Sequence, residues 1–341
     1  MDRIRDVEQE LLRTFRAASD KEEAHAGSRP LLEQLSREPA FLTQVLEKYV
    51  LTPGALAKKN YPVVSMEIAL NPWFSLVANC WIPMVSRETH VATKAIHHHG
   101  PLLLSTVTAF GPGYEHWMFS LPRPIDGSRG LYAMDLLEAA PHPRHHVSFV
   151  DKWTAHTPLF PAALSITFAL WSNSKPTTWR DRLKRIPLLK GREARLRELA
   201  LSLGLRRGLD LKVVEDYDYF PVRDGFEVMP VRKEFERGPV EDHLCSVFNV
   251  MQETGNERLA RTVRRAIDLG KVSPHPKLAE LLERLEGGAP IEGRLSAGHT
   301  DLPYANFTRA QIEQSLAAVK TTNTTAKGGT HGGKFATEAH R

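Results

Sequence analysis

Hydrophobic residues follow two different spacings along the chain, and the change between them divides it. Within residues 6–18, 31–35 and 41–50, apolar side chains recur every three or four positions, as on a helix with one buried face. From residue 61 to 175 they fall instead in short β-branched and aromatic runs separated by glycine, proline and asparagine. These runs predict strands at residues 62–70, 73–85, 102–110, 116–121, 130–136 and 164–172.

After residue 175 the composition becomes charged and the helical spacing returns. Helices are predicted at residues 192–205, 241–252, 257–269 and 277–286. Asp224 and Gly225 mark a turn between two strand-like runs, so a short β-hairpin is expected among these helices. From about Thr321 the chain has too few apolar side chains to offset the entropy of ordering.

These patterns predict a mainly β protein with helical extensions, in which an antiparallel jelly roll is flanked by helices at both ends. The N-terminal helices could cover a face of the barrel or form a homodimer contact, and the pattern does not choose between the two. The expected segments are an N-terminal helical segment, 1–60; a β-barrel, 61–175; a mostly helical region with a short hairpin, 176–320; and a disordered tail, 321–341.

Glycine and proline suggest where several of these elements begin and end. Ser28-Arg29-Pro30 has the form of a helix cap followed by a proline in the first turn. Gly111-Pro112-Gly113 predicts a tight turn, which we expect to join two strands into a hairpin. The polar, proline-flanked residues 139–147 are expected to form a loop at the barrel rim.

Composition narrows the functional classes. The chain of 341 residues is 42% hydrophobic, enough to bury one substantial core, and its net charge of +5 is spread among residues of both signs. No basic stripe with interleaved aromatic residues is present, so nucleic acid is not an expected partner. Cys80 and Cys245 cannot form a disulfide framework, and the start shows no apolar signal region, so a cytoplasmic location is expected. No apolar run reaches the ~20 residues of a membrane span.

Histidines supply the candidate chemistry, because nine of the fifteen lie between His90 and His156. Side chains two apart on a strand share a face, so His97 and His99 can converge on one ion while His98 points away. A third ligand must then come from elsewhere in the fold. His156 is the best-placed candidate, ahead of three rivals in or beside the proline-flanked loop, His142, His145 and His146.

Residues 62–174 resemble a known family. His97-x-His99 at the start of a strand, a later Gly111-Pro112-Gly113 turn and a lone histidine before another β-rich run resemble the two metal motifs of the cupin superfamily. Leu76-x-x-x-Cys80-Trp81 followed by Ile96-His97-x-His99 is similar to the lead-in of cysteine dioxygenase and its thiol-dioxygenase relatives. Leu103 and Leu104 stand where cupins commonly carry a glutamate ligand.

The resemblance implies a cupin-like double-stranded β-helix of the three-histidine type, with one metal held by His97, His99 and His156. Fe(II) is favoured because three neutral imidazoles leave adjacent positions for a substrate and dioxygen, with Zn, Mn and Ni as alternatives. The function expected is a non-haem Fe(II)-dependent oxygenase or dioxygenase acting on a small molecule that chelates the metal. Alternatives are a non-redox metal-dependent isomerase or hydrolase, and a metal-assisted small-molecule sensor or binding module.

No catalytic residue is assigned from the sequence, but two residues are candidates for substrate binding. Tyr114 could donate a hydrogen bond from its phenol into an apolar pocket near the turn. His116 alternates with Glu115 along the strand, so only one of these two side chains can face the barrel interior.

Overall fold

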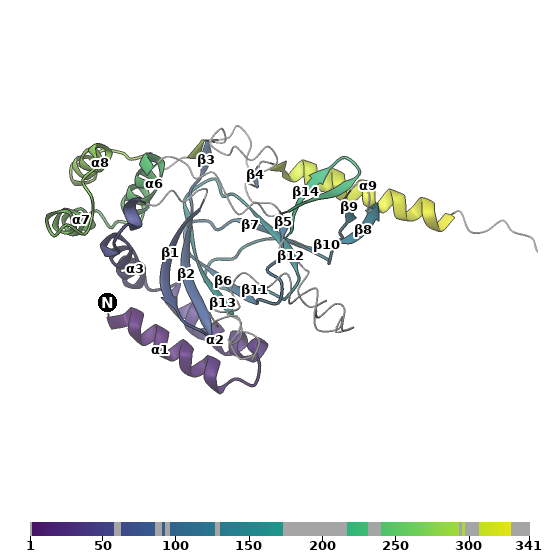
Figure 1. Cartoon of the computed structure of the whole chain (residues 1–341), viewed down its shortest axis with the longest axis horizontal. Coiled ribbons are helices and arrows are strands. Elements are labelled where there is room, and N and C mark those ends of the chain that lie inside the picture. The colour runs from purple at the N-terminus through teal and green to yellow at the C-terminus, as the bar shows by residue number, and fades with distance from the viewer. Residues whose placement is uncertain are drawn as a thin grey trace, which may run out of the picture.

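The structure is a computed structural model that describes residues 2–57, 63–85, 91–92, 96–126, 130–172, 217–230, 240–292, 295–296 and 307–328. The helix predicted at residues 192–205 lies outside this part of the chain. The predicted mainly β fold with helices at both ends is confirmed (Figure 1).

Two sheets form the centre of the molecule. The first contains, in spatial order, β1 (Val63–Leu70), β2 (Phe74–Trp81), β13 (Ser165–Ser172), β6 (Leu104–Phe110) and β11 (Val147–Val150). The second contains β10 (Leu136–Pro141), β7 (Glu115–Phe119), β12 (Ala155–Leu159), β5 (Ile96–His97), β14 (Tyr217–Val222), β15 (Gly225–Pro230), β9 (Leu131–Ala133) and β8 (Arg123–Asp126). Two short pairs flank them, β3 (Met84–Val85) with β16 (Leu295–Ser296) and β4 (Val91–Ala92) with β17 (Phe307–Thr308).

The strand order is that of a jelly roll. The strands β2, β13, β6 and β11 are neighbours in the first sheet, and β5, β12, β7 and β10 are neighbours in the second. Numbered one to eight along the chain, these strands lie in the orders 1-8-3-6 and 2-7-4-5, which is two interlocked Greek keys. The predicted jelly roll is therefore confirmed by topology as well as by strand content.

The hairpin predicted around Asp224 and Gly225 is confirmed as β14 and β15, but it does not stand apart from the barrel. β14 pairs with β5, with Asp218 opposite His97 in the register. The second sheet thus continues beyond residue 175, where the β-barrel segment was expected to end. The reason is long-range pairing, because β5 has an edge that a distant strand completes.

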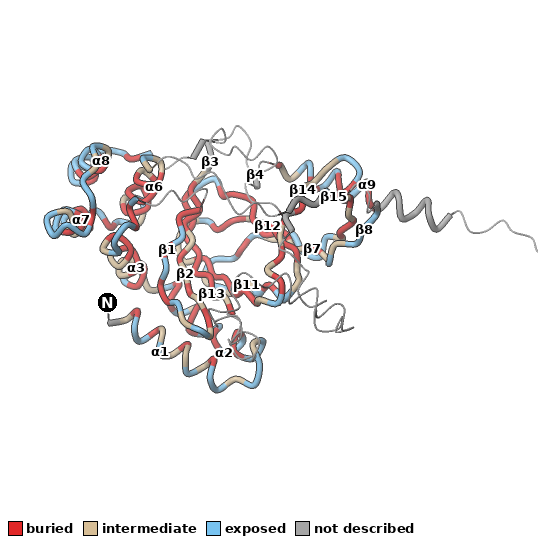
Figure 2. The backbone as a smooth tube through the Cα atoms, viewed as in Figure 1, coloured by how far each residue is buried: buried red, intermediate tan, exposed pale blue. Residues whose placement is uncertain are grey.

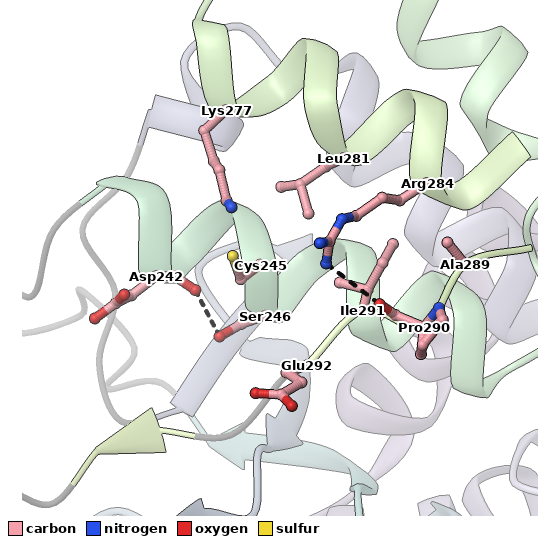
Figure 3. A pocket seen from close by; sticks show the side chains of 10 residues that line it. All are labelled: Asp242, Cys245, Ser246, Lys277, Leu281, Arg284, Ala289, Pro290, Ile291 and Glu292. Atoms are coloured by element: carbon pink, nitrogen blue, oxygen red, sulfur yellow. Dashed lines mark hydrogen bonds between the residues drawn. The ribbon is translucent and has the colours of Figure 1, made fainter. Parts of the chain in front are cut away.

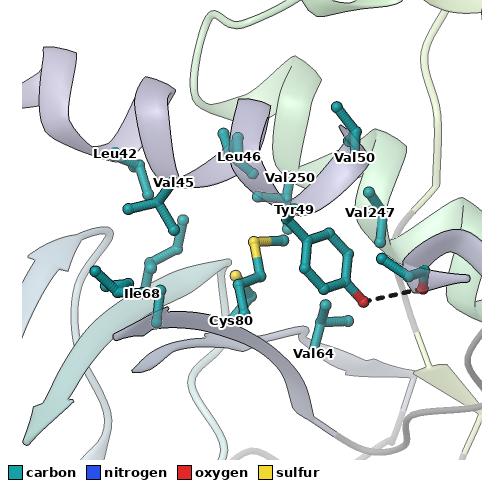
Figure 4. Close-up of a cluster of buried hydrophobic side chains, with 14 of the residues drawn as sticks. Leu42, Val45, Leu46, Tyr49, Val50, Val64, Ile68, Cys80, Val247 and Val250 are labelled. Atoms are coloured by element: carbon teal, nitrogen blue, oxygen red, sulfur yellow. Dashed lines mark hydrogen bonds between the residues drawn. The ribbon is translucent and has the colours of Figure 1, made fainter. Parts of the chain in front are cut away.

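The N-terminal helices cover the first sheet. They are α1 (Asp2–Ala17), α2 (Lys21–Leu35), α3 (Pro39–Leu51) and a short 3-10 turn (Ala55–Ala57), and their buried faces share one core with the sheet. Figure 4 shows side chains of α3 gathered in one cluster with Cys80 of β2 and with Val247 of α6 (Val240–Glu253). Of the two roles left open for this segment, covering a sheet face is confirmed.

The cap predicted at Ser28-Arg29-Pro30 is wrong. α2 begins seven residues before Ser28, after Asp20, whose carboxylate accepts a hydrogen bond of 2.8 Å from the backbone N–H of Glu23. Pro30 lies inside the helix, and the Ser28 hydroxyl donates to the carbonyl of Ala24 in the preceding turn (2.7 Å). A serine hydroxyl serves either purpose, so the short motif alone could not locate the helix end.

The turn at Gly111-Pro112-Gly113 is confirmed, with φ of 77° at Gly111 and 80° at Gly113. The hairpin expected from it is wrong, because β6 belongs to the first sheet and β7 to the second, and the turn carries the chain between them. The expected rim loop 139–147 is also partly wrong, since it contains the end of β10 and the start of β11. Pro141 is tolerated because β10 is an edge strand, where a missing backbone donor leaves no ladder bond unmade.

Of the C-terminal helices described, the first three agree with the predictions from the sequence, and the last, at residues 309–328, was not predicted. They are α6 (Val240–Glu253), α7 (Leu259–Asp268) and α8 (Pro276–Glu286), which pack beside α3 at one end of the molecule, and α9 (Arg309–Gly328), which lies along β14 and β15. The disordered tail was expected from Thr321, but α9 continues to Gly328, because each residue added to an existing helix gains one backbone hydrogen bond without a new nucleation step. Residues 329–341 lie outside the described part.

Buried positions run through both sheets and the inner faces of the helices (Figure 2). Among the helices described, none has the length and apolar content that a membrane crossing requires.

Gly111 offers a test of this architecture. A Cβ atom there would lie 1.9 Å from the carbonyl oxygen of Leu164, whereas at Gly54, also at positive φ (73°), it would meet nothing within 4 Å. Gly54→Ala should cost only the left-handed backbone penalty, about 1–2 kcal/mol. Gly111→Ala should cost clearly more, because the backbone of the neighbouring segment must move. Urea unfolding of both variants measures the difference, and equal midpoints would contradict the close approach.

Candidate metal centre

The centre is built where β5 and β12 pair. His97 of β5 lies directly opposite His156 of β12 in the antiparallel register, and His99 follows two residues after His97. The ring centroids are 4.6 Å apart for His97 and His99, and 4.8 Å apart for each of these rings with His156. Each ring directs one nitrogen to the cluster, and these nitrogens lie within 4.8 Å of one another. The three histidines selected from the sequence are therefore brought together.

The expected alternation along the histidine run is also observed. His98 turns away from the cluster and is buried, with its ring centroid 5.7 Å from that of Trp153 and 6.3 Å from that of Tyr219. The backbone N–H of Gly100 donates to its Nδ1 at 3.2 Å. Gly100, three residues after the end of β5, adopts a φ of 57° and turns the chain so that its carbonyl accepts from the N–H of Trp153 at 2.8 Å.

His156 is held at both ring nitrogens. Its Nε2 lies 2.7 Å from Nε2 of His99, and its Nδ1 lies 2.8 Å from Nε2 of His116. His116 was expected to contact substrate, but the structure places it behind His156, inside the barrel. Burial, aided by the neighbouring His142 and His97, lowers the pKa of His116 to about 3. A substrate contact for His116 stays a prediction, and a supporting contact to His156 is what the geometry shows.

Glu115 and His116 point to opposite sides, as predicted from their alternation. The Glu115 carboxylate accepts a hydrogen bond from Nε1 of Trp117 at 2.7 Å and forms an ion pair with Arg309 at the start of α9. Only His116 of the two reaches the metal cluster. The alternation of the two residues could be predicted from the sequence. The contact of the inward side chain with His156 could not, because it depends on the strand pairing.

The other candidate histidines, His142, His145 and His146, contact residues outside the metal cluster. His142 is buried with both ring nitrogens in hydrogen-bond contact with threonine hydroxyls, at 2.6 Å from Thr106 and 2.9 Å from Thr108. Burial lowers its pKa to about 4. The remaining two lie at the C-terminal end of α2, with Nδ1 of His145 3.0 Å from the hydroxyl of Ser36, the C-cap residue, and Nδ1 of His146 4.0 Å from a Glu33 oxygen. Within the described part of the chain, none of these three rivals belongs to the metal cluster.

Tyr114 also lies behind the cluster rather than in it. Its ring packs against Trp81, with centroids 4.8 Å apart, and against His142, 4.9 Å apart. Burial raises the pKa of its phenol, an effect that a hydrogen bond with Thr106 partly opposes, so the group stays protonated. The ring centroid is 5.8 Å from that of His116, which stands between Tyr114 and His156. The role of Tyr114 in substrate binding stays a prediction.

The donor set fits a divalent transition metal. Imidazole nitrogens bind such ions at about 2.1 Å, which places two bound nitrogens about 3 Å or more apart. The separation of 2.7 Å between Nε2 of His99 and Nε2 of His156 requires only a small outward shift of one ring. His156 is buried, whereas His97 and His99 are partly exposed, so the cluster is closed on one side and open on the other. The ring of Trp171 lies edge-on to His99, with centroids 4.2 Å apart, and forms an apolar wall.

A separate cleft of about 570 Å³ opens between α6 and α8 (Figure 3). It lies at the far side of the first sheet from β5 and β12 (Figure 1). Its two cations, Lys277 and Arg284, share one carboxylate, that of Glu280, at 2.9 Å and 3.4 Å, and no residue that lines the cleft belongs to the three-histidine cluster. The cleft therefore does not belong to the metal centre.

Comparisons with known proteins are limited to structure. No family model and no curated protein sequence matches the chain. Among solved structures, the chain is similar to TT1209 from Thermus thermophilus, at 10% identity over 35% of this chain and 90% of that one, with a TM-score of 0.24. It is similar to an RmlC-like cupin from Shewanella frigidimarina, at 10% identity, 33% and 76% coverage and a TM-score of 0.19. A DMSP lyase structure matches at 14% identity, 33% and 47% coverage and a TM-score of 0.20.

The three-histidine cluster can be tested with single substitutions. His97→Ala and His99→Ala should each remove most bound metal while the protein stays folded, because each strips one ligand from a partly exposed position. His98→Ala should keep its metal but lower the melting temperature, because it deletes a buried ring. Metal analysis and thermal unfolding read out the two effects. Full metal occupancy in either ligand variant would contradict the assignment of that histidine as a ligand. Metal loss in the His98 variant would show that His98, and not its two neighbours, faces the metal.

Proposed function

We propose that this protein is a mononuclear non-haem Fe(II)-dependent oxygenase that acts on a small molecule able to chelate the metal. The observation that carries the proposal is the convergence of three imidazoles from His97, His99 and His156 on one point. These ligands are neutral, so a bound divalent ion keeps its charge and attracts anionic or thiol groups of a substrate. A chelating substrate and dioxygen would complete the coordination.

The residues around the cluster suggest the direction of substrate approach. His156 is buried and is backed by His116, which closes the interior side. His97 and His99 are partly exposed, so a small molecule would enter on their side and pass the edge of Trp171. In this arrangement the protein binds and orients the substrate and keeps the inner side of the centre dry. Iron, when bound, supplies the electron-transfer chemistry with dioxygen.

A second candidate is a non-redox enzyme that uses Zn, Mn or Ni as a Lewis acid. The same observation supports it, because imidazole binds several of these ions well and no described residue excludes them. A metal-assisted sensor or binding module is a third reading, in which the helices that cover the first sheet contact a partner. In this third candidate the partner could be a second copy of the chain, so a homodimer stays a proposal. Measuring substrate turnover under air, together with the identity of the bound metal, distinguishes the oxygenase, the Lewis-acid enzyme and the binding module.

The direct experiment compares the protein purified with and without oxygen. We expect one iron per chain in the anaerobic preparation, and oxygen consumption when small thiols or other bidentate chelators are added. The matched control is the same protein loaded with zinc, which should bind the chelator but consume no oxygen. Turnover by the zinc form without oxygen would favour the Lewis-acid reading, and no turnover with any metal would favour the binding module.

His156 gives the sharpest test of the ligand set. His156→Gln should lose most of the metal and all turnover, because two histidines compete poorly with water for a labile divalent ion. His156→Asp should keep part of the metal, since a carboxylate can bind iron, but its turnover should be altered or lost. His145→Gln is the control, because His145 contacts α2, and it should behave as the wild type. Wild-type metal content and rate in both His156 variants would place the third ligand elsewhere.

A further inference from the structure

We propose that His116 is a positioning residue of the metal centre, which fixes the proton of His156 on Nδ1, so that the lone pair of Nε2 can bind the ion. The inference rests on the proposed metal function of the three-histidine cluster. It assigns to His116 a role other than the substrate contact expected from the sequence.

The position of His116 follows from the pairing of β7 and β12. His116 lies opposite Pro158 in the register, and Met118 lies opposite His156. His116 and His156 are therefore diagonal neighbours, two residues apart along paired strands, and their side chains share one face of the sheet. This diagonal brings Nε2 of His116 to 2.8 Å from Nδ1 of His156, with ring centroids 5.0 Å apart.

The three imidazoles of His116, His156 and His99 form a chain with two possible proton arrangements. In one, His156 donates from Nδ1 to His116 and its Nε2 carries a lone pair toward His99, across the 2.7 Å contact. In the other, His116 donates to Nδ1 and the Nε2 of His156 carries the proton. Only the first arrangement lets His156 bind a metal through Nε2, because a metal-bound nitrogen cannot keep its proton.

The surroundings keep the His116 ring in place for this task. His116 is only 6% exposed, and the rings of Tyr114 and His142 lie beside it, with centroids 5.8 Å and 6.4 Å away. His142 is itself fixed at both nitrogens by Thr106 and Thr108. The acceptor for His156 is thus a neutral ring set in a rigid, buried layer, rather than the carboxylate or carbonyl that more often orients a metal-binding histidine.

The test uses two substitutions of similar size. In His116→Gln the amide can reach Nδ1 of His156 and accept its hydrogen bond, whereas His116→Leu fills the space without an acceptor. We expect His116→Leu to bind Zn²⁺ about 10–100-fold more weakly than the wild type in a chelator competition. His116→Gln should recover most of that affinity. His243→Leu is the matched control, because it removes a buried imidazole that contacts Tyr49 and not the three-histidine cluster, and it should bind Zn²⁺ as the wild type does.

A second measurement is independent of metal. Long-range ¹H–¹⁵N spectra of the metal-free protein report which ring nitrogen of His156 carries the proton. We expect the Nδ1-protonated form in the wild type and in His116→Gln, and its loss in His116→Leu. Wild-type affinity together with an unchanged tautomer in His116→Leu would overturn the role of His116. If His97→Ala also bound Zn²⁺ as the wild type does, the metal centre itself would be wrong, and the spectra would still decide the tautomer.

Discussion

The antiparallel pairing of β5 with β12 is the contact on which the rest of the site depends. It sets His97 opposite His156, and the two-residue alternation of a strand then brings His99 to the same side. β5 spans only Ile96–His97 and could not hold this position alone. It is fixed because β12 pairs with it on one edge and β14 on the other. A strand from beyond residue 216 therefore stabilises the geometry of a motif near residue 97.

The polar interior behind His156 is stable because its members satisfy one another. Burying an imidazole without a partner costs free energy, so each buried ring needs a hydrogen-bond partner. His116 has His156, and His142 has two threonine hydroxyls. The helix-covered core on the other sheet is packed mainly with apolar side chains, as around Val45 and Cys80 (Figure 4). The apolar core between the helices and the first sheet is thus separate from the polar group of side chains behind His156.

What the sequence could predict was mostly local. Alternation predicted that His97 and His99 share a face, because this depends only on strand geometry. His156 does lie in one cluster with His97 and His99, but its register with His97 was not visible in the chain. The wrong predictions arose where a distant contact overrode a local signal. The Gly111 turn has the sequence of a hairpin, but β6 pairs with β13 and β11. Pro30 has the sequence of a helix start, but an earlier cap and a buried face extend α2 across it.

The same limit explains why the inner side of the centre could not be foreseen. A short histidine motif shows ligands, but the atoms that orient those ligands come from other strands. Here the orienting group is a further imidazole, that of His116, and burial lowers its pKa to about 3, so it adds no charge behind the ligands. A neutral centre holds its metal less tightly than one with a carboxylate, but it leaves the full positive charge of the ion for a chelating substrate. Selectivity for an anionic ligand would then arise from the absence of a carboxylate among the metal ligands as much as from the imidazoles that are present.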